Sequence, residues 1–429
     1  MSSLKKLTLQ VLVFSAFFPY PAIVELGNTA GLQVSQILAA IIVLLTLPRI
    51  VQTRSTLAFV ILVVPILLSL GALAFLGLRG DVDLAIRYTL GLMFALLILP
   101  AGGSLMKQAR VEWLVNPASL AICIHAIVGV WQYRAFASGA FPLLAVFRNP
   151  SFHDMQDIST SYALYVARPF GLFPEPSAMA ASLGPWSLFL LWYGLRPGAK
   201  GRSKALVASA GGILLILLSQ SLYAVFLLPG AFLILLLHRR ASSRRISVLE
   251  LLAWGLAGIG LFLFAILSAG RIDVSANAST QGRWASLSDG LGEPFTNLVS
   301  LLVGLGPGQS PAVLGAHGGG VTAIYSVIVS AFAEGGLIAL VAMICVWVMC
   351  LHGRTPGYRY VLLYAWVAGI GFTTSYISLS PIWLFLAMML DLEFQSESSP
   401  RDPDFGLGWS RAPLSVSGSC SVQRQRSEY

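Results

Sequence analysis

Long apolar runs separated by short polar or Gly/Pro-rich stretches dominate the chain. A membrane-crossing helix needs about 20 mostly apolar residues, so each run is a candidate span. The two longest runs are expected to break or kink where polar residues or glycines interrupt them, at Ser219-Gln220-Ser221 and at Glu334-Gly335-Gly336. The pattern predicts twelve spans, near residues 7–24, 32–48, 57–77, 84–101, 113–134, 176–195, 205–219, 221–238, 248–268, 321–351, 359–375 and 377–392.

Composition supports this interpretation and sets the domain boundary. Of the 429 residues, 56% are hydrophobic and only 10% are charged, whereas an ordinary soluble domain carries about 25% charged residues. The deficit excludes a water-soluble globular enzyme, a disordered chain and a coiled coil. Residues 394–429 are rich in Ser, Pro and charge and lack an apolar period. We therefore expect a membrane domain over 1–393 and a disordered cytoplasmic tail over 394–429.

The net charge of +9 is a topology signal. In a soluble protein such a charge would suggest nucleic acid, but in a membrane protein the side on which the charges lie matters more. If the N-terminus is inside and the spans alternate, 20 of the 27 Lys and Arg residues fall inside and 7 outside. Every loop then follows the positive-inside rule. This predicts an even number of spans with both termini cytoplasmic, and a bilayer rather than nucleic acid as partner.

Two long outside segments, about 135–175 and 269–320, contain most of the outside arginines. The planar arginine fork binds phosphate or carboxylate through two parallel hydrogen bonds, so these arginines are candidate anion ligands. The alternative is loop solvation or contact with lipid head groups. The candidates inside the two segments are Arg148, Arg168, Arg271 and Arg283.

Arg168 is the strongest candidate because its loop is stiff. It opens the string Arg-Pro-Phe-Gly-Leu-Phe-Pro-Glu-Pro-Ser at 168–177, whose prolines and glycine restrict the backbone. Such a loop can hold an arginine against a lipid diphosphate. Glu175 supplies an opposite charge, as a general base or, slightly favoured, as the partner of Arg168 in a structural ion pair.

The other acidic clusters suggest structural roles first. Asp81-Val82-Asp83 resembles a metal-binding D-x-D motif, but charge balance against neighbouring arginines is favoured. His153, Asp154 and Asp157 have metal-like spacing in an outside loop, where solvation is the more common role. Glu334 lies deep in an apolar run, where a carboxyl group is expensive. We interpret it as structural first and substrate-related second.

Several motifs resemble the O-antigen ligase and Wzy-type polysaccharide polymerase superfamily. The string at 168–177 resembles the family's R-x-x-G-x-F-x-E-P motif, and Ser219-Gln220-Ser221 stands where the family commonly has Ser-Arg. Gly282-Arg283-Trp284 followed by Gly304-Leu305-Gly306-Pro307-Gly308 is a further match. Ala333-Glu334-Gly335-Gly336-Leu337-Ile338 is similar to the family's E-x-G-x-x-G stretch. The matches run in family order from about 140 to 390.

The resemblance implies an all-α, GT-C-like glycosyltransferase of the bacterial inner membrane with two large periplasmic loops. It would transfer a growing glycan from undecaprenyl diphosphate onto the next lipid-linked repeat unit, without metal or cofactor, alongside a flippase and a chain-length or export protein. The family's diphosphate-binding arginines carry over onto Arg168 and Arg283, with Arg271 and Arg148 as further candidates. Glu175 is the first candidate for the base, and His317 and His153 are the alternatives.

One departure separates the chain from ligases. The ligase pattern places a His before a nine-residue spacer and G-x-x-G, but Ile324-Tyr325 occupies that place and His317 is seven positions too early. This favours a polymerase for a secreted exopolysaccharide, such as one of xanthan type. An O-antigen-type ligase remains an alternative. A flippase or transporter of lipid-linked oligosaccharide is a second, although the spans lack the several charges and the internal repeat that it predicts.

Overall fold

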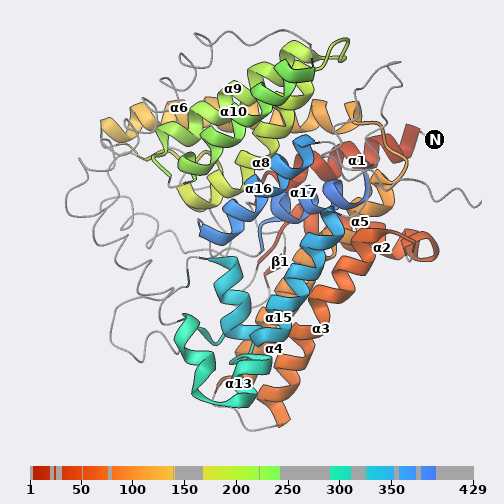
Figure 1. Cartoon of the computed structure of the whole chain (residues 1–429), viewed down its shortest axis with the longest axis vertical. Coiled ribbons are helices and arrows are strands. Elements are labelled where there is room, and N and C mark those ends of the chain that lie inside the picture. Colours follow the sequence, from red (N-terminus) through yellow and green to blue (C-terminus); the bar gives the residue numbers. More distant parts are fainter. Residues whose placement is uncertain are drawn as a thin grey trace, which may run out of the picture. The chain divides into compact units, whose positions relative to one another are not determined.

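The described part of the chain is mostly helical and contains one two-stranded antiparallel sheet (Figure 1). A computed structural model describes residues 3–19, 24–25, 31–50, 52–75, 80–138, 140, 168–221, 223–241, 290–310, 324, 326–351, 357–372 and 378–392. Contacts group Met1–Ser396 into one compact unit, to which all these residues belong. The predicted tail at 394–429 lies outside the described residues and stays a prediction.

Helices coincide with eleven of the twelve predicted spans, and the run at 248–268 lies outside the described residues. The elements are α1 (Ser3–Ala16), β1 (Val24–Glu25), β2 (Gly31–Leu32), α2 (Val34–Ile50), α3 (Arg54–Phe75), α4 (Val82–Leu96), α5 (Ile98–Met106), α6 (Glu112–Ala137), α8 (Pro176–Leu195), α9 (Arg202–Leu218), α10 (Ala224–Ala241), η2 (Glu293–Thr296), α13 (Leu298–Val303), α15 (Val327–Leu351), α16 (Gly357–Phe372) and α17 (Ser380–Asp391).

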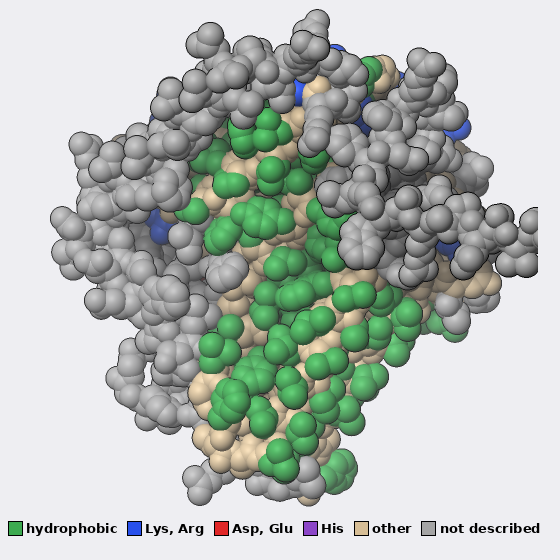
Figure 2. Space-filling view, in the orientation of Figure 1, with side chains coloured by type: hydrophobic (Ala, Val, Ile, Leu, Met, Phe, Trp, Pro, Cys, Tyr) green, Lys and Arg blue, Asp and Glu red, His purple; other side chains and the backbone are tan. Residues whose placement is uncertain are grey.

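Five stretches of the described chain are long and apolar enough to cross a membrane. They are Arg54–Phe75, Val82–Met106, Glu112–Phe136, Pro176–Leu195 and Val327–Leu351. Large apolar side chains are exposed along α3 and α15, among them Leu67 and Val341, and Figure 2 shows them covering one face of the molecule. Soluble proteins rarely expose so extensive an apolar surface. The described chain therefore has the architecture of an all-α membrane protein.

The helices α8 and α17 form the centre of the unit. All residues of α17 are buried, and so are most of α8, including Trp186 and Trp383. Helices that are hydrophobic on all sides are expected inside a bundle. Small residues allow close approach: a side chain at Gly184 of α8 would overlap the Tyr223 ring, and the Tyr223 hydroxyl donates to the Ala365 carbonyl of α16 at 2.9 Å.

Several predicted boundaries were wrong, and proline explains two of them. The first helix ends at Ala16 instead of residue 24, shortly before Pro19, and β1 pairs antiparallel with β2. The predicted span 84–101 consists of α4 and α5, which meet at Leu97. Pro100 has no N–H to donate to the Leu96 carbonyl four residues earlier, and the two helices meet at the residue after that carbonyl.

Two predicted breaks are confirmed. α9 and α10 are separate helices on either side of Ser219-Gln220-Ser221, and Gln220 adopts a left-handed conformation with φ of 50°. The backbone of Gly336 is non-helical within α15. The predicted loop at 269–320, in its described part 290–310, contains η2 and α13.

Candidate functional site

The arginine of the 168–177 motif is docked on the turn between α9 and α10. Arg168 Nε donates to the Ser219 carbonyl at 2.7 Å, and its terminal nitrogen donates to the Gln220 carbonyl at 3.2 Å. The side chain is partly exposed. Two hydrogen bonds from one planar guanidinium fix the orientation of the group. Two motifs about 50 residues apart in sequence are thus in direct contact.

The backbone that follows Arg168 is clamped by a glutamine of α6. Gln132 Oε1 accepts from the N–H groups of Phe170 at 3.1 Å and Gly171 at 2.9 Å, and Gln132 Nε2 donates to the Gly171 carbonyl at 2.8 Å. Gly171 has φ of +62°, a conformation that L side chains rarely adopt. These three bonds pair buried backbone groups that would otherwise lack a hydrogen-bond partner. Gln132 therefore fixes the backbone conformation of the loop.

His125, two helical turns before Gln132, supports the same loop. The Leu172 N–H donates to His125 Nδ1 at 3.1 Å, so Nδ1 is the acceptor and Nε2 carries the proton in the neutral ring. Nε2 accordingly donates to the Phe17 carbonyl at 2.9 Å. The ring is fully buried and lies 4.7 Å, centroid to centroid, from Phe173. The histidine therefore joins the end of α1, helix α6 and the loop.

Glu175 lies at the start of α8. It is the residue before Pro176, the first helical position, and its carboxylate accepts a hydrogen bond from the Ser177 hydroxyl. A carboxylate at this place is stabilised by the positive end of the helix dipole. The described contacts of Glu175 are thus with its own helix, while those of Arg168 go to the α9–α10 turn; the predicted Arg168–Glu175 ion pair is not formed.

A second pair of motifs meets where α13 ends. The Leu305 N–H donates to the Ala333 carbonyl at 2.9 Å, and the Gly306 N–H donates to the Glu334 carbonyl at 3.2 Å. In an unbroken helix these two carbonyls would accept hydrogen bonds from the N–H groups four residues later, but Gly336 interrupts α15. Because Gly304 and Gly336 have no side chains, the two backbones approach closely. The loop Gly304–Ser310 therefore takes the place of a helical turn.

The Glu334 side chain holds the same loop from within. Its carboxyl group accepts from the Ser310 hydroxyl and from the backbone N–H groups of Gly308 and Ser310. The Ser69 hydroxyl of α3 donates to its main-chain carbonyl. Gln309 completes the attachment by pairing with the backbone of Asp81, accepting from its N–H at 2.9 Å and donating to its carbonyl at 3.0 Å. Through these contacts Glu334 has a structural role, as expected: it joins α15 to the Gly304–Ser310 loop and to α3.

The remaining sequence candidates divide into two groups. Asp83 forms an ion pair with Arg87, which fits the predicted charge balance, and Asp81 caps the N-terminus of α4. No cluster of three or more His, Cys, Asp or Glu suited to a metal ion occurs in the part of the chain that the structure describes. Arg148, Arg271, Arg283 and His317, with His153, Asp154 and Asp157, lie outside the described residues.

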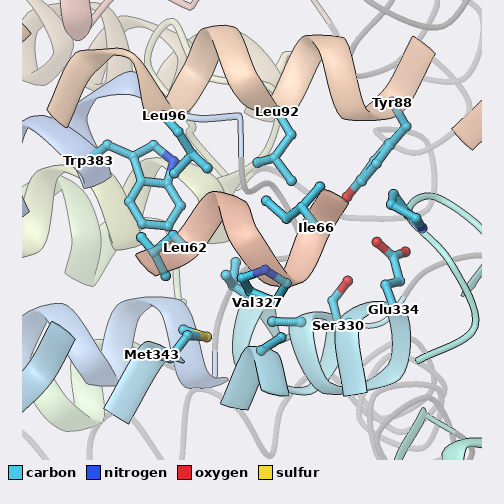
Figure 3. Close-up of a pocket in the computed structure, with 15 residues that line it drawn as sticks. Leu62, Ile66, Tyr88, Leu92, Leu96, Val327, Ser330, Glu334, Met343 and Trp383 are labelled. Atoms are coloured by element: carbon cyan, nitrogen blue, oxygen red, sulfur yellow. The ribbon is translucent and has the colours of Figure 1, made fainter. Parts of the chain in front are cut away.

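A mostly apolar pocket of about 60 Å³ lies between α3, α4 and both halves of α15 (Figure 3). Glu334, Tyr88 and Ser330 lie toward one end, and Trp383 lies at the other. Pro307 of the Gly304–Ser310 loop also contributes to its wall. We call this space the Glu334 pocket.

Sequence reasoning missed the supports of both loops. His125 and Gln132 are polar residues two turns apart on one face of an otherwise apolar span, and polar side chains within spans usually face the bundle interior. That spacing was the signal that could have identified them. Gln309 and Ser310 directly follow the glycine run, but no local pattern indicates their distant partners Asp81 and Glu334.

Removing Gln132 should loosen the Arg168 loop. The change Gln132→Ala deletes three hydrogen bonds and leaves buried backbone groups unpaired, which costs about 1–3 kcal/mol for each unsatisfied group. We expect faster chymotrypsin cleavage after Phe170, measured on detergent-solubilised protein by mass spectrometry. Arg134→Ala, at an exposed site on the same helix, is the control. Unchanged cleavage in Gln132→Ala would show that the clamp does not order the loop.

No family model and no curated protein matches the chain.

Proposed function

We propose that the protein is a polysaccharide polymerase that transfers a growing glycan from undecaprenyl diphosphate onto the next lipid-linked repeat unit. The observation that carries the proposal is the pairing of the motifs behind the family resemblance. The 168–177 motif contacts the Ser219–Ser221 turn, and the Gly304–Gly308 run contacts Ala333–Gly336. Motifs that are far apart in sequence yet packed together are expected of one functional assembly.

The chemistry of the proposed reaction suits the Arg168 loop. The leaving diphosphate is a weak base, so its departure needs stabilisation of negative charge more than it needs a proton. Arg168 supplies a permanent charge on a loop held by Gln132 and His125, and little reorganisation is needed when an anion binds. In this proposal Arg283 is the second diphosphate ligand, with Arg271 and Arg148 as further ligands, and Glu175 or His317 accepts the proton of the sugar hydroxyl.

The proposed topology agrees with contacts between segments predicted on the same side. On the periplasmic side, Asp81 pairs with Gln309 and Arg168 with Ser219. On the cytoplasmic side, Lys107 Nζ donates to the Gln52 carbonyl at 3.1 Å, and Asp391 accepts from the Arg54 N–H at 2.9 Å. These contacts agree with an alternating arrangement of the spans. In this proposal the chain has twelve spans in the bacterial inner membrane, both termini are cytoplasmic and the site is on the periplasmic face.

The proposal is tested by the lipid-linked glycans that accumulate when the gene is deleted in its host. A polymerase deletion should leave single repeat units on the periplasmic face and no long polymer, as measured by mass spectrometry of extracted lipids. Full-length polymer that is no longer attached to lipid A would identify an O-antigen-type ligase instead. Repeat units retained on the cytoplasmic face would identify a flippase. Either result would overturn the polymerase proposal.

A further inference from the structure

The Glu334 pocket is elongated because the chain turns back within α15. A straight helix would separate Val327 from Met343 by about 24 Å, at 1.5 Å per residue. Both residues nevertheless line the same pocket. Figure 3 shows Glu334 at one end of the pocket and Met343 toward the other, beyond Val327. The non-helical Gly336 permits this reversal, so the two halves of α15 form a continuous wall with α3 and α4.

One end of the pocket is closed and apolar, and the other is polar. Leu62, Leu96, Met343 and Trp383 surround the closed end and are buried. Tyr88 and Ser330, beside Glu334, are partly exposed, as is Ile66. A ligand with its polar group beside Glu334 would place an apolar part toward Trp383.

The polar end is chemically suited to a neutral head group. The hydroxyls of Tyr88 and Ser330 lie on the same side of the pocket as the Glu334 carboxyl (Figure 3). Among the described residues that line the pocket, none is Lys, Arg or His. A phosphate would approach an acidic side chain with no cation to neutralise it. A ligand hydroxyl can instead donate to the carboxyl group and accept from a side-chain hydroxyl.

The volume limits the apolar part of the ligand to a single chain. A buried water needs about 10–15 Å³ by this measure, so about 60 Å³ holds a few waters or a segment of one hydrocarbon chain. Apolar cavities tend to exclude water, and filling one with hydrocarbon is favourable.

We propose that the Glu334 pocket binds a single-chain neutral lipid whose head group is a hydroxyl, with the hydroxyl at Glu334, Tyr88 and Ser330 and the chain directed toward Trp383. This site is chemically distinct from the arginine-based diphosphate site at Arg168. It depends on neither the polymerase activity nor the identity of the glycan, so the two proposals can fail independently.

Photolabelling of the purified full-length protein in nanodiscs tests the site. The probe is a long-chain alcohol carrying a diazirine in the chain. Comparison probes are its phosphate monoester and the same chain without a head group. The alcohol should label peptides of α3 and α15 that line the pocket, at least about ten-fold more than either comparison probe, a difference of about 1.4 kcal/mol. Equal labelling by all three probes would overturn the proposal.

Variants separate pocket binding from contact with the lipid-facing surface. Leu62→Trp fills the closed end and should abolish labelling by the alcohol, whereas Leu67→Trp, on the exposed face of the same helix, should leave it unchanged. Ser330→Ala removes one hydroxyl with little change in volume. It should lower labelling about five-fold, as expected for one net hydrogen bond, and it serves if Leu62→Trp does not fold. Labelling that resists both pocket variants would exclude the site.

Discussion

Replacing Arg168 with Ala is expected to abolish polymer formation while the protein remains in the membrane. In the proposed reaction Arg168 stabilises the leaving diphosphate, and loss of one preorganised donor of this kind costs about 10²–10³ in rate. The substitution also removes the bonds that join Arg168 to the Ser219 and Gln220 carbonyls. The measurement is polymer yield from a deletion strain complemented with the variant, together with immunodetection of the protein in the membrane fraction.

Arg87→Ala is the matched control for this experiment. Arg87 is also predicted on the periplasmic side, but it is exposed and pairs with Asp83 on the same helix. Exposed ion pairs of this kind contribute little to stability, so polymer yield should remain normal. Normal yield from Arg168→Ala at unchanged protein level would remove Arg168 from the mechanism. Loss of the Arg168→Ala protein itself would indicate that its bonds to the α9–α10 turn are mainly structural.

Replacing Gly336 with Ala should strongly destabilise the protein. Gly336 has φ of 65° and ψ of −162°, a region essentially restricted to glycine, where another residue costs about 1–3 kcal/mol. A Cβ atom there would also overlap the Leu302 carbonyl and approach the Gly304 nitrogen, and relieving such overlap costs about 1–3 kcal/mol more. We expect a clear drop in the midpoint of heat-induced aggregation of the detergent-solubilised protein, together with a lower yield.

Gly71→Ala, in α3, distinguishes this effect from a general intolerance of glycine replacement. Gly71 is helical, and a Cβ atom there would meet no other atom within 4 Å. Alanine is preferred to glycine in a helix by about 0.5–1 kcal/mol, so the midpoint should stay the same or rise. If Gly336→Ala behaves like Gly71→Ala, the close contact between α13 and the break in α15 does not stabilise the fold.

Much of the candidate site was visible in the sequence as separate pieces. The stiff loop after Arg168 and the helix breaks at Ser219–Ser221 and Gly336 were predicted from proline, glycine and polar residues, whose effects on the backbone are local. Their mutual contacts were not predicted. Arg168 could have paired with Glu175, seven residues away, but it bonds to carbonyls 51 and 52 residues away.

For Glu334, too, the local role was predicted but its distant partners were not. Its place in an apolar run indicated that it must be satisfied internally, since a carboxyl group is costly there. The sequence did not indicate that Gly308 and Ser310 of the Gly304–Ser310 loop would donate hydrogen bonds to the carboxyl group. That arrangement depends on the contact between α13 and the break in α15. The walls of the Glu334 pocket were likewise not predicted, because they come from helices distant in sequence.

Apolar length and the placement of lysine and arginine were sufficient to predict a helical membrane protein, because transfer of a side chain into lipid depends mainly on its own chemistry. They did not reveal that α8 and α17 lie at the centre while α3 and α15 expose apolar faces, since lipid and a protein interior are both apolar and select similar side chains. Close packing and the pairing of buried polar groups distinguish the two environments, and both depend on which helices are neighbours in three dimensions.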